Sequence, residues 1–189
     1  CHMMHRMPMS GIFELFIPGV KAGEIYKYEM KLKGGTVQLK SDPYAACTEL
    51  PPASASVVAD LRDFQWDDAK WMEERIRFRD RKQPVSIYET SLSNWKDTSE
   101  LVSYVKELKY THVELHPVME YLDEEAGEYS TFAYYAPDRR FGTPEDFQKL
   151  VNALHKENIG VILDWTPSHF PRQEGGLENF DGTPLYENP

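Results

Sequence analysis

The stretch Gly160-Val-Ile-Leu-Asp-Trp-Thr-Pro-Ser-His-Phe170 decides the fold of this 189-residue chain. Val161 to Leu163 is a short apolar run, typical of a parallel strand that helices cover on both faces. Asp164 ends the run. Because the loops at the carboxyl ends of parallel strands carry the chemistry of α/β sheets and barrels, Asp164 is a candidate site residue. The alternative is an ordinary turn in which Asp164 only caps a backbone amide.

Two strand–helix pairs precede this stretch. Val85 to Glu89 and Thr111 to His116 have the pattern of strands. Asp97 with Glu100 three residues later predicts one capped helix start, and Thr143-Pro144 predicts another, because proline at the first helical position loses no hydrogen bond. The predicted buried stripes are Leu101, Val105 and Leu108 in the first helix, and Phe147, Leu150, Val151 and Leu154 in the second.

The resulting order is strand, helix, strand, helix, strand. Such an order implies parallel pairing through right-handed crossovers. Three strands cannot close into a barrel, so the third strand is an exposed edge unless more chain follows Pro189. An exposed edge invites pairing with another molecule.

Residues 1–60 have a different pattern, in which short alternating strands are separated by turns. The predicted strands include Ile12 to Ile17, Ile25 to Met30 and Ser56 to Asp60, and Gly34-Gly35 predicts a hairpin turn before a further strand. These features are typical of an antiparallel sandwich, but about four or five segments are fewer than the seven or so of a complete one. We therefore expect a partial β-sandwich.

Residues 61–83 form a charged, aromatic linker that contains Trp66, Trp71 and the basic cluster Arg75 to Lys82. A solvated connector is the simpler interpretation of this composition. The alternative is a surface that contacts a glucan.

Composition limits the classes of partner. The formal net charge of -10 argues against binding to nucleic acid, whose phosphates require a basic surface. Aromatic residues make up 13% of the chain, which suits sugars because their apolar faces stack on aromatic rings. The two cysteines, Cys1 and Cys47, are too few for a disulfide framework and indicate a reducing compartment. No apolar run approaches roughly 18 residues, so no membrane span is expected, and residues 1–9 lack the apolar core of a secretion signal.

His112, Glu114 and His116 alternate along one predicted strand, so their side chains share a face. This pattern permits a zinc site. The alternative is a polar barrel interior in which the same side chains form hydrogen bonds with their neighbours.

The long segment after that strand contains Tyr129, Tyr134 and Tyr135. Long loops in compact α/β domains are usually functional or disordered, and these rings could stack on a sugar or simply anchor the loop. Asp164 and His169 lie five residues apart and could hold sugar hydroxyls. The chain has no serine triad signature, glycine-rich phosphate loop or Cys-x-x-Cys motif.

Asp164-Trp-Thr-Pro-Ser-His-Phe-Pro171 resembles the first signature region of the α-amylase clan in the form that glycogen branching enzymes use. Six further stretches resemble the same family in the same order. They are Leu15 to Gly19 and Leu39 to Ala45 in the glucan-binding β-sandwich, Val85 to Glu89 and Thr111 to Leu115 as the first two barrel strands, and Tyr135 to Phe147 with Phe180 to Tyr186 after them.

This resemblance implies a multidomain fold. Residues 1–60 would be a partial N-terminal β-sandwich of the carbohydrate-binding type, 61–83 a linker, and 84–189 the first three βα units of a (β/α)8 TIM barrel. The implied activity is that of a transferase that cuts an α-1,4-glucan and reattaches the piece to a 6-hydroxyl, forming an α-1,6 branch by a retaining double displacement. Asp164 and His169 would bind the sugar beside the scissile bond, and Tyr129 would stack beneath it.

The sequence departs from the family pattern in one place, because Gly127-Glu128 precedes Tyr129 and Ser130 follows it where the family has Trp-Gly and Gln. The resemblance places the nucleophilic Asp and the acid Glu on later strands, beyond residue 189. The chain is therefore expected to be an internal fragment without turnover of its own.

The expected partners are the α-glucans glycogen and amylose, with no cofactor, metal, nucleic acid or membrane involved, and the expected location is the cytoplasm. Trp165 and Pro167 favour branching over the alternatives within the clan, which are a debranching or a trehalose-releasing hydrolase. A non-catalytic glucan-binding module is the alternative from another class.

Overall fold

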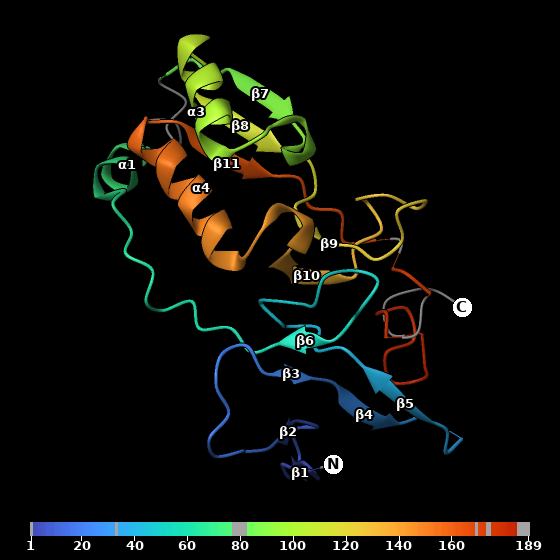
Figure 1. Cartoon of the computed structure of the whole chain (residues 1–189). Helices are drawn as coiled ribbons and strands as arrows, with labels where there is room; N and C mark the ends of the chain where they lie inside the picture. Colours follow the sequence, from blue (N-terminus) through green and yellow to red (C-terminus); the bar gives the residue numbers. More distant parts are fainter. Residues whose placement is uncertain (1, 33, 77–82, 169, 173–174, 185–189) are drawn as a thin grey trace.

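The structure is a computed structural model that describes residues 2–32, 34–76, 83–168, 170–172 and 175–184. Its described helices and strands fall into two regions (Figure 1). A region of short antiparallel strands contains the N-terminus, and a region of parallel strands and helices follows it in sequence, with a small hairpin between them. None of the helices in this described part is long and apolar enough to cross a membrane.

The parallel sheet consists of β7 (Ile87–Thr90), β8 (His112–Leu115) and β11 (Gly160–Leu163). Its order is β11-β8-β7, and both neighbouring pairs are parallel. Helices α3 (Thr98–Glu107) and α4 (Pro144–Lys156) connect these strands. The predicted strand–helix order is therefore confirmed.

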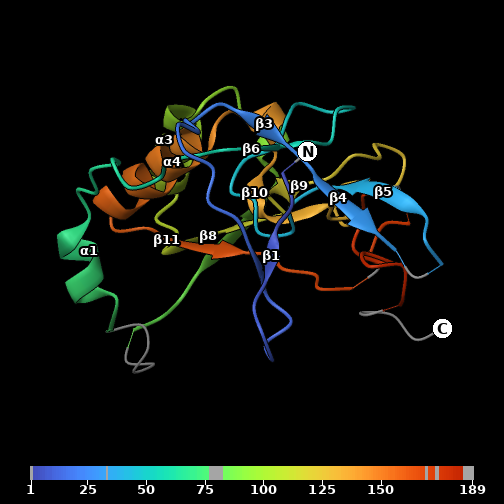
Figure 2. The same cartoon turned by 90° about the horizontal axis from the view of Figure 1, so that it is seen from below.

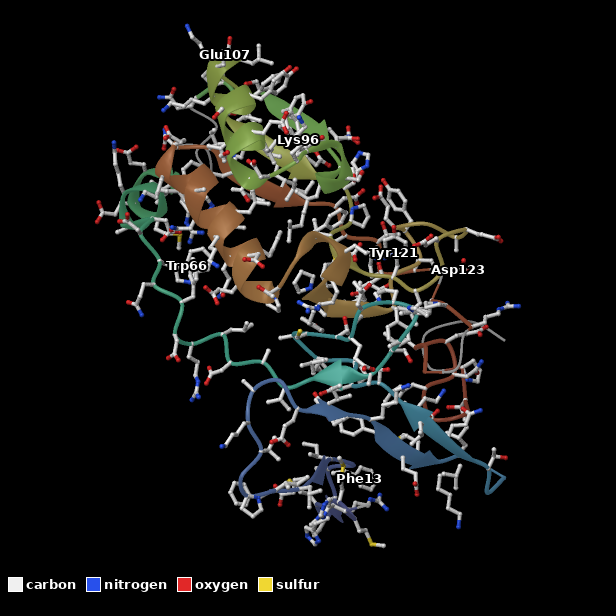
Figure 3. The ribbon with its side chains drawn as sticks, viewed as in Figure 1. Phe13, Trp66, Lys96, Glu107, Tyr121 and Asp123 are labelled. Carbon is white, nitrogen blue, oxygen red and sulfur yellow. The ribbon has the colours of Figure 1, made fainter. Side chains whose placement is uncertain are left out.

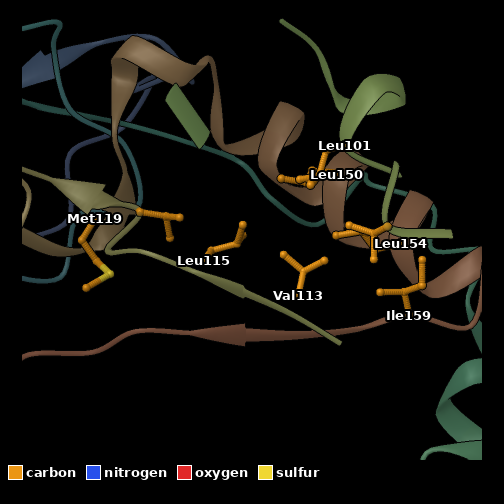
Figure 4. Packing of buried hydrophobic residues seen from close by; sticks show 9 residues of the cluster. Leu101, Val113, Leu115, Met119, Leu150, Leu154 and Ile159 are labelled. Carbon is orange, nitrogen blue, oxygen red and sulfur yellow. The ribbon is translucent and has the colours of Figure 1, made fainter. Parts of the chain in front are cut away.

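The core lies between the sheet and the two helices, where side chains from both layers meet (Figure 4). Val113 and Leu115 of β8 are fully buried, whereas His112 and Glu114 on the opposite face are only half-buried. Leu150 and Leu154 of α4 pack against this apolar face together with Leu101 and Val105 of α3. The period-2 alternation of β8 therefore directs its apolar side toward the helices.

Both helix starts follow the predicted chemistry. The Asp97 carboxylate accepts hydrogen bonds from the backbone N–H groups of Ser99 and Glu100 at 2.8 and 3.0 Å. Thr143 and Asp146 form a reciprocal capping box at the start of α4. The predicted burial of Leu108 is wrong: this residue is the C-cap of α3 and lies exposed, because the helix ends before its side chain reaches the core.

Strand β11 is not buried on both faces, contrary to expectation. Val161 and Ile162 are half-buried, and Leu163 is exposed. Among the described residues β11 pairs only with β8, so it is the predicted open edge of the sheet. The apolar sequence of β11 is typical of an inner strand, although in this structure β11 lies at the edge of the sheet.

The segment predicted as a solvated linker contains α1 (Ala69–Glu74), which packs against α4. Trp71 is buried, and its ring stacks on that of His155 with centroids 5.1 Å apart. The Asp68 carboxylate forms a hydrogen bond with Nδ1 of His155 at 2.8 Å. Trp71 is therefore neither solvated nor available to a glucan, whereas Trp66 is exposed. Residues 77–82 of the basic cluster lie outside the described residues.

Over its described residues, the N-terminal region contains three antiparallel strand pairs rather than one continuous sheet. β1 (His5–Arg6) pairs with β2 (Phe13–Glu14), β3 (Ile25–Tyr26) with β6 (Ser56–Val57), and β4 (Tyr28–Lys31) with β5 (Val37–Lys40). The turn at Gly34-Gly35 connects β4 to β5, as predicted. Figure 2 shows these strands from below.

Two of the predicted N-terminal strands are much shorter than expected. Only two residues of Ile12 to Ile17 form a strand, and Ser56 to Asp60 is reduced to β6. Phe13 and Phe16 are exposed, and Phe13 lies on β2 at the end of the molecule opposite to α3 (Figure 3). Strands of this kind need an opposing sheet to bury their apolar faces, and the described residues provide none at this place.

The long segment after β8 is more ordered than predicted. It contains the antiparallel hairpin of β9 (Met119–Glu120) and β10 (Ala133–Pro137). Tyr134 and Tyr135 belong to β10 and not to a loop: Tyr134 is buried and Tyr135 exposed, as a strand requires. Of the three tyrosines considered in the sequence, Tyr129 is the one that lies in the connection between the two strands.

Candidate active site

Polar side chains gather where the three parallel strands end. Glu89 is the third residue of β7, His116 follows β8, and Asp164 follows β11. The ladder continues through these positions, because the N–H of His116 donates to the carbonyl of Thr90 at 3.0 Å and the N–H of Asp164 donates to that of Leu115 at 2.9 Å. The backbone hydrogen bonds therefore fix both residues at one edge of the sheet.

His116 connects two carboxylates. Its Nε2 lies 3.2 Å from Oε1 of Glu89, and its Nδ1 lies 3.0 Å from Oε1 of Glu128. Glu89 is largely exposed, whereas the side chains of His116 and Glu128 are half-buried. This bridge ties the loop that contains Glu128 to the ends of β7 and β8.

Tyr129 and Asp164 lie together, as the predicted site requires. Partial burial raises the pKa of the Tyr129 hydroxyl, and the charge of Asp164 and a hydrogen bond with it raise the pKa further. The phenol therefore stays protonated at neutral pH and donates to the Asp164 carboxylate. The ring of Tyr129 is 45% exposed, so a face or edge remains open to a ligand.

The turn after Asp164 contacts strand β10 of the hairpin. The Tyr134 hydroxyl donates to the carbonyl of Thr166 at 3.0 Å, and the Tyr134 ring contacts those of Trp165 and Phe170 at 5.2 and 5.8 Å. His169, the second predicted sugar-binding residue in this turn, lies outside the described residues.

The zinc alternative finds no support in the positions of the strand β8 side chains. His112 is near the start of the strand and its ring lies 6.2 Å from that of Trp71, whereas His116 lies at the other end with Glu89 and Glu128. Across the described ranges no group of three or more His, Cys, Asp or Glu side chains is arranged to hold a metal ion.

Glu89 and Glu128 were not singled out from the sequence. Glu89 had a usable signal, because it stands at the end of the first predicted strand as Asp164 stands after the third. Glu128 had none, since only the folded loop brings it to His116. We name the five residues Glu89, His116, Glu128, Tyr129 and Asp164 the strand-end cluster.

A second polar cluster, also missed from the sequence, joins the two regions of the molecule. Glu120 of β9 is fully buried, and its Oε2 accepts hydrogen bonds from the Thr48 hydroxyl at 3.0 Å and the Arg139 N–H at 2.9 Å. Arg140 Nη2 lies 3.6 Å from Oε1 of Glu120, and its Nε donates to Asp138 at 2.9 Å. We name these five residues the buried junction. Arg139 and Arg140 belong to the 3-10 helix η2 (Arg139–Phe141).

A cavity beside the two helices does not coincide with the candidate site. This cavity of about 370 Å³ lies between the N-terminal ends of α3 and α4 and is lined by residues such as Trp95, Asp97 and Phe147. None of the strand-end cluster lines it. The candidate site is instead an open edge, where carboxylates, an imidazole and a tyrosine converge and can bind the hydroxyl groups of a neutral ligand.

Comparison with known families assigns both regions. Residues 77–179 match the family described as alpha amylase, catalytic domain, and residues 1–45 match carbohydrate-binding module 48, the isoamylase N-terminal domain. The prediction of a partial glucan-binding sandwich followed by the first units of a (β/α)8 barrel is confirmed by these matches.

The chain is similar to curated proteins named 1,4-alpha-glucan branching enzyme GlgB. It is 47% identical to that of Frankia casuarinae over 98% of this chain and 24% of the relative, and 43% identical to that of Corynebacterium efficiens over 100% of this chain and 26% of the relative. The chain therefore spans about a quarter of the length of these relatives.

Among solved structures, a putative alpha amylase from Salmonella typhimurium superposes with a TM-score of 0.74 at 26% identity, covering 94% of this chain and 30% of that one. A pullulanase in complex with maltotetraose shares the fold, with a TM-score of 0.53 at 18% identity over 74% of this chain and 24% of that one. With more than half of its residues matched by the catalytic-domain family, the chain belongs to the alpha-amylase family.

Proposed function

We propose that this chain is the glucan-binding part of a glycogen branching enzyme, which cleaves an α-1,4-glucan and transfers the piece to a 6-hydroxyl. The observation that carries the proposal is the pairing of Tyr129 with Asp164 at the carboxyl ends of parallel strands, in a chain 47% identical to a named branching enzyme. The match of residues 1–45 to a carbohydrate-binding module supports an α-glucan such as glycogen or amylose as the ligand.

In this proposal each residue of the predicted site has one task. The Asp164 carboxylate accepts hydrogen bonds from hydroxyls of the sugar beside the scissile bond, and the Tyr129 ring stacks beneath that sugar. Because the Tyr129 hydroxyl already donates to Asp164, the carboxylate is oriented before the ligand arrives. His169 is assigned to the same sugar on the resemblance alone.

The reaction requires two further carboxylates. A retaining transfer needs a nucleophile on one face of the sugar and an acid on the other, and the second step replaces water with the 6-hydroxyl of an acceptor chain. We assign neither task to a residue of this chain. Asp164 acts on the same sugar by holding it while positive charge develops at the anomeric carbon.

The proposal includes the organisation and location of the protein. Residues 1–60 would be the glucan-binding sandwich, 61–83 the connection and 84–189 the start of the barrel. The packing of α1 on α4 supports treating the connection as part of the folded barrel layer. A cytoplasmic location is supported by the low number of cysteines, of which Cys47 is free and buried.

The test is incubation of the full-length protein with amylose, followed by enzymatic debranching of the products. Branching predicts new α-1,6 linkages without a rise in reducing ends before the debranching step. A rise in reducing ends without new branches would show a hydrolase. Retention on glycogen with neither product would show a binding module, and both results would overturn the proposal.

A further inference from the structure

Three exposed aromatic rings lie next to one another beside the strand-end cluster. The ring centroids of Tyr44 and Tyr135 are 5.4 Å apart with an interplanar angle of 26°, and those of Tyr135 and Trp165 are 6.2 Å apart at 63°. Tyr44 is 76% exposed, Tyr135 57% and Trp165 45%. We name these three side chains the aromatic patch. It begins one residue after Asp164.

The patch joins the two matched families. Tyr44 lies in the segment that matches the carbohydrate-binding module, whereas Tyr135 and Trp165 lie in the segment that matches the catalytic domain. A ligand that covers all three rings would therefore contact both regions at once. A continuous surface of this kind is expected where a long chain passes from a binding module to a reaction site.

The rings are held in place by buried or hydrogen-bonded neighbours. The Asp42 carboxylate accepts hydrogen bonds from the Tyr44 N–H at 2.8 Å and the Tyr26 hydroxyl at 2.6 Å. Tyr135 is a residue of β10, and the ring of its neighbour Tyr134 contacts that of Trp165 with centroids 5.2 Å apart. The backbone of Tyr44 and of Tyr135 is thus fixed before a ligand binds, which favours affinity.

We propose that the aromatic patch binds the glucose units of an α-1,4-glucan that lie remote from the reacting bond. The C–H face of a pyranose ring is apolar and flat enough to stack on an aromatic ring, and glucan is neutral, which suits a chain of net charge -10. The inference rests on the proposed function, because it assigns the remote part of the same substrate.

The size of the patch favours a sugar chain over a protein partner. With the exposed fractions given above, three aromatic side chains offer roughly 400 Å² of surface. A stable protein interface buries about 800 Å² on each partner. A few glucose units match the smaller area.

The experiment measures maltoheptaose binding by calorimetry and amylose kinetics on the full-length protein, comparing wild type with Tyr44→Ala and Tyr135→Ala. Each substitution removes one stacking ring and is expected to weaken maltoheptaose binding about 3- to 10-fold. The KM for amylose should rise by a similar factor while kcat at saturation stays unchanged, since the patch does not touch the reacting sugar. Tyr44→Phe and Tyr135→Phe keep the rings and are expected to bind like wild type.

The outcomes separate this inference from the proposed function. Wild-type branching with unchanged affinity and KM in both alanine variants would overturn the role of the patch and leave branching intact. Failure of wild type to branch amylose would overturn the proposed function, whereas ring-dependent maltoheptaose binding would still support the patch. If Tyr44→Ala instead converts a dimer to a monomer in size-exclusion chromatography without changing glucan affinity, the patch is a contact between protein copies and the inference is wrong.

Discussion

The strand-end cluster and the buried junction both contain carboxylates, and the chain that links them is short, from His116 to Glu120. In the buried junction Glu120 is 0% exposed, and protein groups occupy its oxygen Oε2. In the strand-end cluster Glu89 is largely exposed and Tyr129 is about half-exposed. In the first arrangement protein donors fill an oxygen of the buried carboxylate, and the second leaves polar atoms open to a ligand.

This difference separates structural carboxylates from functional ones. A buried carboxylate that accepts hydrogen bonds from Thr48 and Arg139 holds two regions together, and removing it leaves buried donors without partners. A half-exposed carboxylate at a strand end contributes little to folding, because water replaces its partners readily. Substitutions should therefore affect activity in one cluster and stability in the other.

The largest expected effect is on activity, from Asp164→Asn in the full-length protein. The amide keeps the size of the side chain but loses the negative charge that stabilises the developing positive charge. We expect kcat on amylose to fall by about 10²- to 10³-fold. The measurement is the rate of new α-1,6 linkages under saturating amylose.

The stability of Asp164→Asn is measured by urea denaturation. We expect its free energy of unfolding to differ from that of wild type by no more than about 0.5 kcal/mol, as for surface substitutions in general. Near-normal turnover would contradict the subsite role of Asp164. Loss of several kcal/mol of stability would mean that Asp164 is a structural carboxylate like Glu120, and the contrast between the clusters would disappear.

The second effect is on stability, from Glu120→Ala. The substitution leaves the Thr48 hydroxyl and the Arg139 N–H without their acceptor and removes the partner of Arg140, so we expect a loss of about 3 kcal/mol in the free energy of unfolding. Urea denaturation at neutral pH measures it. Glu120→Gln is the control, because its amide oxygen can still accept, and it should lose less. Equal stability of wild type and Glu120→Ala would show that the junction does not hold the regions together.

The parallel sheet was largely predictable from the sequence, whereas the contacts between regions were not. The capping residues Asp97 and Thr143 and the alternation in His112 to Leu115 are local signals, and the structure follows them. Burial of Trp71 and Glu120 depends on chain segments that are distant in sequence, and no local pattern encodes such a partner.

Within the site the same division holds. Asp164 could be predicted because the end of a parallel strand is a position defined by local pattern. Tyr129 was distinguished from Tyr134 and Tyr135 only through the family resemblance, and Glu128 was missed, because a loop residue has no periodicity from which to infer its direction. Tyr134 and Tyr135 lie in a short run whose side chains alternate between buried and exposed, which is a strand signal. The length of the whole segment favoured a loop instead.

The third effect concerns pH. Burial raises the pKa of Glu120 to about 6, the nearby charge of Asp138 acts in the same direction, and the hydrogen bonds from Arg139 and Thr48 and the charge of Arg140 oppose it. The folded protein therefore holds this proton more tightly than the unfolded chain, whose carboxyl has a pKa near 4.5. The stabilising contribution of the protonated Glu120 carboxyl is complete below about pH 4.5 and is lost as the pH rises through about 6.

The measurement is the difference in unfolding free energy between wild type and Glu120→Gln across this range. The wild-type protein should lose unfolding free energy relative to Glu120→Gln as the pH rises from 4.5 to 6. Above this range the difference should become constant, and the glutamine does not titrate at any pH. Other carboxylates, such as Asp97 and Asp146 with lowered pKa values, titrate in both proteins and cancel. A difference that does not change with pH would show that Glu120 has the same proton affinity in both states.

The smallest effect is expected from His116→Gln in the strand-end cluster. The imidazole of His116 pairs with Glu89 and Glu128, and both pairs are partly exposed, so each is worth at most about 1 kcal/mol. Stability should therefore change little. The amylose KM should rise by no more than about 5-fold, because Glu128 precedes Tyr129 and loses the contact that positions its loop. A kcat loss as large as that of Asp164→Asn would instead place His116 in contact with the reacting sugar, and a stability loss like that of Glu120→Ala would assign it to the structural class.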